Sequence, residues 1–303
     1  MATILITGGT GLIGNALSKK LIASGHEVRI LSRNPKSNGT IKAFRWNVES
    51  GTIDEAAFDG IDHIVHLAGS GIADKRWTDA RKKDLIDSRV ESMKLITDVV
   101  KKKNIHLKSF VGASAIGIYG MNTSEKIYAE TDKGTSDFLS HICEVWENSY
   151  KEIESLSEKN TILRIGVVLS ENGGALKRLL PLFRFGLGSA VGSGRQYMPW
   201  IHVDDMVSVI YEALFNAQLK GIYNAVALEH MTNSAFSKAL AKSLYKPFFM
   251  PNVPAFLMKL VFGEMANVLL EGSRVNDQKL LNTGFSFKYP TISAALKKIS
   301  ELK

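Results

Sequence analysis

The sequence predicts an α/β fold, with a Rossmann-type doubly wound parallel sheet and a smaller, mainly helical C-terminal lobe. Three observations carry this prediction: an apolar strand enters a glycine-rich loop at the N-terminus, strand and helix patterns alternate through the first half, and Gly and Pro become frequent after Leu169. With 303 residues, 45% of them hydrophobic and 22% charged, the chain is long enough for one large or two smaller globular domains.

The first predicted strand covers residues 2–6 and is followed at once by the sequence TGGTGLIG, residues 7–14. Apolar side chains then recur at helical spacing as far as Ile22, so a helix follows the loop. Glycines let the backbone turn tightly, and the free N–H groups and positive dipole end of a helix attract phosphate. This order of elements predicts a pyrophosphate-binding loop, whose expected ligand contacts are Thr7, Gly8, Gly9, Gly11, Leu12, Ile13 and Gly14.

Further strands and helices follow in alternation. The strands are predicted at residues 26–31, 42–46, 61–67, 109–113 and 161–165, and two long helices at about residues 77–103 and 136–157. Right-handed connections between parallel strands place helices on both faces of the sheet, and ligands bind beyond the carboxyl ends of the strands. We therefore expect a nucleotide-binding domain at residues 1–170 and a substrate lobe at 171–303, with a segment at about 200–226 returning to the first domain.

The end of the second predicted strand decides which dinucleotide the loop would hold. An acidic residue there accepts hydrogen bonds from a ribose 2′-hydroxyl, whereas a basic residue pairs with a 2′-phosphate. The residues at this point are Ser32 and Arg33, and no carboxylate occurs in residues 31–38. Arg33 offers a planar, permanently charged fork for phosphate, and Ser32 offers a further hydrogen bond. NADP(H) is therefore predicted in preference to NAD(H); the alternative is an exposed loop arginine without a ligand.

Composition argues against several functional classes. The net charge of +8 is scattered, and its densest cluster, residues 101–103, closes a predicted helix without interleaved aromatic residues, so nucleic-acid binding is not predicted. No uninterrupted apolar run approaches the roughly 18 residues of a membrane helix, so no membrane association is predicted. The N-terminus has no basic leader and Cys143 is the single cysteine, which together predict a cytoplasmic protein without a disulfide.

Seven segments carry a family resemblance. The segments TGGTGLIG at residues 7–14, HLAG at 66–69, LRIGVVL at 163–169 and WIHVDDM at 200–206 resemble the extended short-chain dehydrogenase/reductases in order and spacing. The segments GIADKRW at 71–77, VGSGRQY at 191–197 and the tail at about 247–296 resemble an atypical epimerase-family subgroup with its own C-terminal domain, described as nucleoside-diphosphate-sugar epimerase-like or SulA-like. The resemblance covers essentially the whole chain and implies the fold, whereas the biochemical function of the subgroup is poorly defined.

The resemblance also implies cofactor contacts. The glycines of the loop would line the pyrophosphate, and the segment Leu67, Ala68 and Gly69 would pass beneath the adenosine and the nicotinamide-side ribose. Small residues at the end of a buried strand permit such an approach, and a simple turn is the alternative. Arg164, in the segment after the sixth strand, is a further expected cofactor contact, and Asn47 could reach the adenine edge.

The expected catalytic positions depart from the broader family. Its members use a Ser or Thr after the fifth strand to orient the substrate and a Tyr-x-x-x-Lys pair on the next helix, in which the lysine lowers the pKa of the tyrosine for proton transfer. Ser114 and Tyr119 match the serine-to-tyrosine loop of the extended enzymes. Counting back from Glu147, however, the tyrosine position is Leu139 and the lysine position is Cys143. Leucine has no proton to transfer and a neutral thiol does not replace an ammonium charge, so the usual proton relay is predicted to be absent.

Other side chains are therefore candidates for a proton donor. Tyr119 could act as the acid or could pack as an aromatic residue in a glycine-flanked loop. Asp74 and Lys75 follow the fourth strand, near the expected nicotinamide, and could act there or form a solvated charge run ahead of the long helix. Glu130 is a further candidate acid.

Two residues later in the chain are further candidates, His202 as a proton donor and Arg195 as a substrate contact. His202 is predicted to be structural, with a backbone partner for its ring and with Asp204 or Asp205 capping the next helix. No set of metal ligands accompanies it, so no metal site is predicted. Arg195 lies in a glycine-flanked loop that suits an anion, and the resemblance implies that it could hold the diphosphate of a substrate.

These observations leave two main interpretations. In the first, the protein is an NADP(H)-dependent oxidoreductase or epimerase that acts on a small molecule such as a sugar nucleotide or a carbonyl compound, with a homodimer as one possible assembly. In the second, it binds NADP(H) without turnover and acts as a redox-sensing scaffold or, as the SulA-like resemblance implies, a cell-division-related one. The missing Tyr-x-x-x-Lys pair favours the second interpretation, whereas Ser114 and Tyr119 favour the first.

Overall fold

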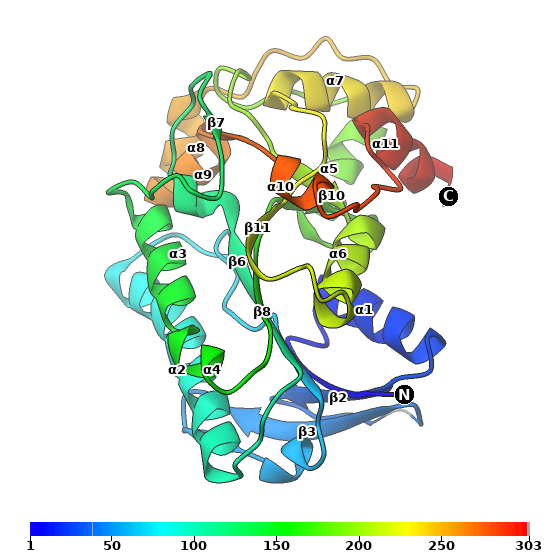
Figure 1. The fold of residues 1–303 in the computed structure, drawn as a ribbon. Coiled ribbons are helices and arrows are strands. Elements are labelled where there is room, and N and C mark those ends of the chain that lie inside the picture. The colour runs from blue at the N-terminus through cyan, green and yellow to red at the C-terminus, as the bar shows by residue number, and fades with distance from the viewer. Residues whose placement is uncertain (38, 302–303) are drawn as a thin grey trace.

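The computed structural model describes residues 1–37 and 39–301. Its centre is an eight-stranded sheet with the order β11-β8-β6-β5-β1-β2-β3-β4 (Figure 1). Neighbouring strands are parallel, except that β3 and β4 are antiparallel. The strands are β1 (Thr3–Thr7), β2 (Glu27–Ser32), β3 (Ile41–Asn47), β4 (Thr52–Ile53), β5 (His63–His66), β6 (Ser109–Ala115), β8 (Asn160–Ile165) and β11 (Gly221–Ala225).

Strand β1 occupies the point where the strand order reverses, because it pairs with β2 on one side and with β5 on the other. The registers align Thr7 with Leu31 of β2 and with His66 of β5, so the carboxyl ends of the three strands are level. Such a reversal leaves a crevice beyond the strand ends, where open α/β sheets bind ligands. The predicted Rossmann-type parallel sheet is confirmed.

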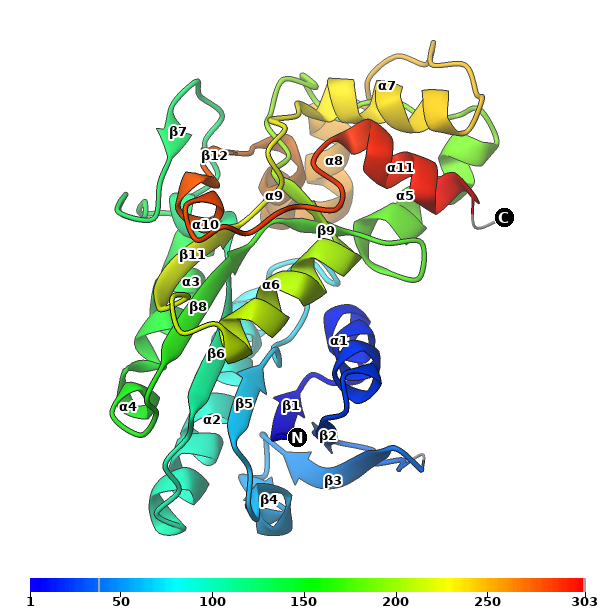
Figure 2. The same ribbon diagram turned by 45° about the vertical axis from the view of Figure 1, so that its right-hand side comes forward.

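Helices cover both faces of this sheet (Figure 2). Successive residues of β1 point to opposite faces, so Ile4 and Ile6 pack in the core beneath α1 and α6, whereas Leu5 packs in the core beneath α2 and α3. Because β1 is buried on both faces of the sheet, each of its interior positions carries an apolar side chain. The helices of these two layers are α1 (Leu12–Ala23), α6 (Val203–Phe215), α2 (Asp79–Lys102), α3 (Phe138–Asn148) and α4 (Lys151–Glu154).

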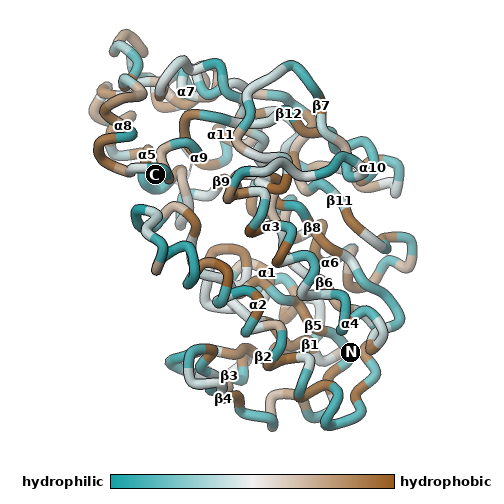
Figure 3. The backbone as a smooth tube through the Cα atoms, turned by 90° about the vertical axis from the view of Figure 1, so that its left-hand side faces the viewer, coloured by the Kyte–Doolittle hydropathy of each residue, from teal (hydrophilic) through white to brown (hydrophobic). Residues whose placement is uncertain are grey.

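A second group of helices lies beyond the carboxyl ends of the strands, at the top of Figures 1 and 2. Its core combines α5, α7 and α11 and includes Leu180, Phe236 and Leu296. Helix α8 differs because it has no buried residue, and its apolar side chains give the brown surface helix of Figure 3. The helices are α5 (Gly174–Arg184), α7 (Asn233–Ser243), α8 (Ala255–Phe262), α9 (Asn267–Leu270), α10 (Gln278–Leu281) and α11 (Ile292–Glu301).

Short elements link the two groups of helices. Strand β9 pairs in parallel with β10, and β7 pairs in parallel with β12, outside the main sheet. These strands are β7 (Ile127–Tyr128), β9 (Val167–Leu169), β10 (Trp200–His202) and β12 (Arg274–Val275). Three single-turn 3₁₀ helices are η1 (Glu55–Phe58), η2 (Ile116–Tyr119) and η3 (Gly263–Ala266).

Two predicted helix boundaries were wrong. The helix expected from residue 77 begins at Asp79, because the Thr78 hydroxyl accepts a hydrogen bond from the N–H of Arg81 at 3.2 Å and caps the helix. The helix expected at residues 136–157 is divided into α3 and α4. The division falls at Tyr150, a fully buried residue whose hydroxyl donates to the carbonyl oxygen of Ala113 at 2.6 Å. This anchor to β6 depends on tertiary packing and is not visible in the local periodicity.

Candidate functional site

The glycine-rich loop joins β1 to α1 in a conformation that only glycine suits. Gly8 has φ +67°, and a Cβ there would stand 2.8 Å from the carbonyl oxygen of Leu67. A Cβ on Gly14 would stand 2.4 Å from the carbonyl oxygen of Gly8. Gly11 is the N-cap of α1 and provides no side-chain hydrogen bond, so the first N–H groups of the helix are not capped by a side chain. A cradle that any Cβ would fill, next to such a helix end, fits the pyrophosphate of a dinucleotide.

Thr7 lies beneath this loop and joins the ends of β1 and β5. It is fully buried, and its hydroxyl oxygen accepts hydrogen bonds from the N–H groups of Leu67 at 3.1 Å and Ala68 at 3.2 Å. The same hydroxyl is 2.8 Å from Nδ1 of His66, whose Nε2 is 3.2 Å from the hydroxyl of Ser92. Thr7 therefore holds the segment from Leu67 onward in position under the loop.

His66 is a buried residue that sequence reasoning did not single out. Its side chain is fully enclosed, and burial lowers its pKa from 6.5 to about 3, with a smaller contribution from the nearby Arg89 guanidinium. The ring is therefore neutral and acts as a hydrogen-bonding strut between Thr7 and Ser92. The only sequence signal that could have identified His66 was its position directly before Leu67, a predicted cofactor contact.

The residues expected to select the dinucleotide lie at the end of β2, beside the glycine-rich loop. The Ser32 hydroxyl oxygen accepts a hydrogen bond from the N–H of Asn34 at 3.3 Å. Arg33 is exposed, and its guanidinium forms no hydrogen bond with any other residue in 1–37 or 39–301. The Asn47 side chain accepts from the N–H of Glu49 at 3.0 Å and stands at the end of β3. The arrangement leaves the Arg33 charge free for a ligand phosphate.

An open cleft of about 620 Å³ borders the first turns of α1. Gly11 and Leu12 form one wall, and the loop around Gly173 and the start of α6 at His202 form the other. A cleft of this size is in the range of small-molecule sites. Its lining residues are Thr10, Gly11, Leu12, Asn15, Ala16, Lys19, Ser170, Glu171, Asn172, Gly173, Gly174, His202, Val203, Asp204 and Lys298.

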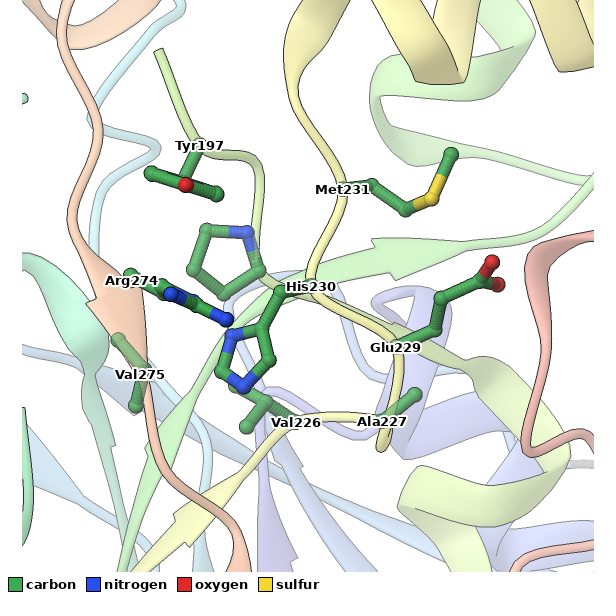
Figure 4. Close-up of a pocket in the computed structure, with 9 residues that line it drawn as sticks. Tyr197, Val226, Ala227, Glu229, His230, Met231, Arg274 and Val275 are labelled. Atoms are coloured by element: carbon green, nitrogen blue, oxygen red, sulfur yellow. The ribbon is translucent and has the colours of Figure 1, made fainter. Parts of the chain in front are cut away.

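A second cavity, drawn in Figure 4, is much smaller. It measures about 10 Å³ and lies among Tyr197, His230 and Arg274, where the β11 chain continues toward α7. This volume is at the lower limit for a single water molecule, so the cavity is too small for a substrate.

On the other side of the switch point, the place at β1 where the strand order reverses, the predicted catalytic Ser114 belongs to a buried polar network. Its hydroxyl donates to Oε1 of Glu147 at 2.7 Å. The Arg164 guanidinium binds both oxygens of the same carboxylate at 2.9 Å. The side chains of Arg164 and Glu147 are only 7% and 12% exposed, so the pair is almost fully desolvated. The structure engages Arg164 in this ion pair, and its expected contact with the cofactor stays a prediction.

Tyr119 and Glu130 complete the same network. The Tyr119 hydroxyl donates to Oδ1 of Asn224 at 2.7 Å and accepts from Nη1 of Arg164 at 3.1 Å. Oε1 of Glu130 accepts from the N–H of Asn224 at 2.8 Å. Tyr119 is fully buried, and burial raises its pKa above the ordinary value of 10. This geometry favours the packing alternative for Tyr119, and its role as an acid stays a prediction.

The two residues predicted to stand at the positions of the usual Tyr-x-x-x-Lys pair, Leu139 and Cys143, pack among other side chains. Leu139 covers η2, since a Cβ on Gly117 would stand 2.8 Å from its Cγ. Leu139 also packs against a cluster that includes Trp77 and Met265, the latter from the C-terminal segment. Burial raises the pKa of the Cys143 thiol to about 12, so it is neutral at physiological pH. Neither side chain presents a titrating group to a ligand.

Three other candidates lie outside the buried network. Asp74 is exposed and pairs with Arg178 of α5 at 2.8 Å, and Lys75 is exposed beside it. This exposure fits a solvated charge run ahead of α2, and the alternative in which Asp74 or Lys75 takes part in proton transfer stays a prediction. Arg195 is exposed, and only its backbone N–H has a hydrogen-bond partner in the described part of the chain, the hydroxyl of Ser193 at 3.2 Å.

His202 has a structural role, but the capping prediction was wrong in detail. Nδ1 of His202 itself accepts from the N–H of Asp204 at 3.1 Å and caps α6. Asp205 is buried and accepts from the N–H groups of Lys288 and Tyr289 at 2.7 and 3.0 Å. It therefore fastens the C-terminal tail to α6. Nε2 of His202 is buried without a hydrogen-bond partner in the described residues.

In residues 1–37 and 39–301, no helix combines the length and apolarity that a bilayer crossing requires. Within the same ranges, no cluster of three or more His, Cys, Asp or Glu side chains could hold a metal ion.

Comparison with known proteins identifies relatives over the full length. Residues 4–225 match the model of the NAD dependent epimerase/dehydratase family, and residues 253–299 match a domain of unknown function, DUF1731. The chain is 36% identical over 297 residues to the epimerase family protein Mb2239 of Mycobacterium bovis, covering 97% of this chain and 96% of the relative. It is 35% identical over 302 residues to the human epimerase family protein SDR39U1, covering 98% and 99%.

Solved structures resemble this chain over nearly its whole length. The structure of human epimerase family protein SDR39U1 (isoform 2) with NADPH matches with a TM-score of 0.88 and 33% identity, covering 99% of each chain. A nucleoside-diphosphate sugar epimerase from Corynebacterium glutamicum matches with a TM-score of 0.80 and 29% identity, covering 100% of this chain and 59% of the other. UDP-glucuronic acid 4-epimerase from Bacillus cereus, at 18% identity and a TM-score of 0.79, shares the fold.

Proposed function

The chain belongs to the NAD dependent epimerase/dehydratase family, as its sequence motifs indicated, and we propose that it is an NADP(H)-binding oxidoreductase or epimerase of the short-chain dehydrogenase/reductase type. Its substrate would be a small molecule such as a carbonyl compound or a sugar nucleotide. The observation that carries the proposal is the cradle in which Gly8 and Gly14 leave room for a pyrophosphate at the start of α1. The NADPH in the human relative supports the choice of cofactor.

The residues of this chain divide the binding of the dinucleotide among three strand ends. The N–H groups at the start of α1 would hold the pyrophosphate, and the segment after β5, which Thr7 fixes through Leu67 and Ala68, would lie under the ribose. Arg33 and Ser32 at the end of β2 would hold a 2′-phosphate. When bound, NADP(H) supplies or accepts a hydride.

The proton of such a reaction would need a donor outside the usual pair, because Leu139 and Cys143 carry no suitable group. Ser114 and Tyr119 are engaged in the Glu147 network, whereas Asp74 and Lys75 are exposed and accessible. We propose Asp74 and Lys75 as the first candidates to test for proton transfer. Candidate acids must reach the substrate within hydrogen-bond distance, directly or through one water molecule.

A second candidate function has its own supporting observation. The network that encloses Ser114 and Tyr119, together with the packing of Leu139 against Trp77 and Met265, leaves the usual reaction centre without an accessible proton donor. A protein built in this way could bind NADP(H) and report its presence to a partner without turnover. Binding of NADPH with no turnover across carbonyl and sugar-nucleotide panels would favour this second function.

The cofactor choice is tested by titrating the purified protein with NADPH and with NADH, and by repeating both titrations with Arg33→Ala. We expect NADPH to bind at least about tenfold more tightly than NADH, since a charge-assisted contact to the 2′-phosphate is lost with NADH. Arg33→Ala should remove most of that preference and leave NADH affinity unchanged. Lys36→Ala, which removes an exposed positive charge from the same loop, serves as the matched control. Equal affinities that Arg33→Ala does not change would refute the role of Arg33.

A further inference from the structure

Arg89 of α2 is a buried cation without an acidic partner. Its side chain is part of a residue only 7% exposed, and in the described ranges 1–37 and 39–301 no carboxylate forms an ion pair with it. One nitrogen, Nη1, donates to the carbonyl oxygen of Leu85 at 2.8 Å, whereas Nε is buried without a hydrogen-bond partner in those ranges. The guanidinium stacks over the ring of Trp146, with Cζ 4.6 Å from the ring centre. Buried charges are normally paired, so a buried guanidinium without an acidic partner indicates a site for a negatively charged or oxygen-rich ligand.

The position of this guanidinium relates it to the expected cofactor. A Cβ built on Gly69 would stand 3.2 Å from Cζ of Arg89 and 3.5 Å from its Nε. Gly69 follows β5 at the switch point, in the segment that Thr7 fixes beneath the glycine-rich loop. Arg89 therefore lies directly against the strand end where an open α/β sheet receives its ligand.

The same guanidinium lies close to the position that a lysine occupies in the broader family. Arg89 and Cys143 are near enough for the charge of Arg89 to oppose, in part, the burial that raises the thiol pKa. Cys143 is neutral, so it brings no positive charge from α3. Arg89 is the cation that α2 places in this region, and an arginine stays protonated even when burial lowers its pKa.

We propose that Arg89 is a cofactor-positioning residue, which supplies from α2 the positive charge and hydrogen-bond donors that a lysine at position 143 would supply from α3. Its ligand would be an oxygen acceptor on the nicotinamide half of the dinucleotide, a ribose hydroxyl or the adjoining phosphate. The guanidinium holds this oxygen and does not transfer a proton. This inference rests on the proposed function, because it requires a dinucleotide across Gly69.

The proposal makes a prediction that separates the two halves of the cofactor. Removal of Arg89 should weaken the binding of NADPH and leave the binding of 2′,5′-ADP, which lacks the nicotinamide half, unchanged. A merely structural role would weaken both ligands alike, because both need the folded glycine-rich loop. The ratio of the two dissociation constants therefore reports on ligand contact and is insensitive to a uniform loss of folded protein.

The experiment measures both dissociation constants by isothermal titration calorimetry for the wild type, Arg89→Met and Lys94→Met. We expect Arg89→Met to raise the ratio of the NADPH dissociation constant to the 2′,5′-ADP dissociation constant at least about tenfold. This is the effect expected from the loss of one charge-assisted hydrogen bond. Lys94→Met removes an exposed charge from the same helix and should leave the ratio unchanged. If Arg89→Met does not fold, Arg89→Gln gives the same comparison, since its amide can still donate to the Leu85 carbonyl.

Two outcomes would overturn the proposal in different ways. A ratio that is the same in the wild type and in the folded Arg89 variant would overturn the role of Arg89 and leave the proposed function intact. Failure of the wild type to bind NADPH would overturn the proposed function, and the role of Arg89 with it.

Discussion

The two sides of the switch point use the same edge of the sheet in different ways. Beyond β1 and β2, the edge is bare backbone: Gly8 and Gly14 keep side chains out, and Arg33 points a free charge into solvent. Beyond β6 and β8, the edge is closed by the Ser114, Glu147 and Arg164 network. The first side therefore has an exposed charge without a partner in the described residues, whereas the charges of the second side are paired with one another.

This difference teaches that polar residues at a strand end do not by themselves indicate chemistry. A carboxylate that accepts from both a hydroxyl and a bidentate guanidinium has little capacity left for a ligand. The network on this side joins α3 and η2 to the strands β6, β8 and β11, so it stabilises the fold at this edge of the sheet. The open and the closed side should therefore respond differently to substitution.

The largest expected effect comes from breaking the closed side at Glu147. Glu147→Ala would leave the Arg164 guanidinium buried without its partner, and we expect the free energy of unfolding to fall by about 3–5 kcal/mol. Urea denaturation measures this change. The exposed Glu144, on the same helix, provides the control variant Glu144→Ala, which should stay within about 0.5 kcal/mol of the wild type. A small loss in Glu147→Ala would mean that the network does not stabilise the fold.

The next effect is a pH dependence that originates at the boundary between the two sides. Burial lowers the pKa of His66 to about 3, so the unfolded chain binds more protons than the folded chain between about pH 6.5 and pH 3. The folded state therefore keeps its full stability, as far as His66 is concerned, above about pH 6.5. The free energy of unfolding decreases as the pH falls through this window. Between about pH 7 and pH 5, the expected loss from His66 alone is about 2 kcal/mol.

The measurement is urea denaturation at both pH values for the wild type and for His66→Gln. The variant should lose that part of the pH dependence, although it is less stable overall. His106→Gln, which replaces an exposed histidine, is the matched control and should retain the pH dependence of the wild type. An identical pH dependence in all three proteins would contradict the assignment to His66.

The smallest expected effect comes from a substitution of Tyr119, which the sequence predicted as a candidate proton donor. Tyr119→Phe keeps the buried ring and removes the hydroxyl between Asn224 and Arg164, so we expect a loss of about 1–2 kcal/mol in the free energy of unfolding. NADPH affinity, measured by fluorescence titration, should stay within about twofold, because the hydroxyl faces the interior. Tyr197→Phe removes a hydroxyl that bonds to the exposed Glu125 and should cost less. A strong loss of NADPH affinity in Tyr119→Phe would place Tyr119 on the ligand side after all.

The sequence predicted the sheet and the glycine-rich loop well because both depend on short-range patterns. Apolar runs such as residues 2–6 and 109–113 identify strands that are buried on two faces, and strand-helix alternation implies their parallel arrangement. The helix at residues 136–157 was predicted too long, because its break at Tyr150 depends on a hydrogen bond to Ala113 of another element. The two-residue strand β4 and the edge strand β11 were not predicted, since neither has a strong local pattern.

By itself, the sequence determined the shape of the glycine-rich loop, because Gly8 and Gly14 act through their own backbone geometry. It also predicts that Leu139 and Cys143 take the places of the usual Tyr-x-x-x-Lys pair. Only the tertiary structure decided which polar residues are engaged with one another. Ser114, Glu147 and Arg164 meet from β6, α3 and β8, and desolvation of their charges arises only when these elements pack together. The lack of an acidic partner for Arg89 among the described residues is likewise a result of how the elements pack.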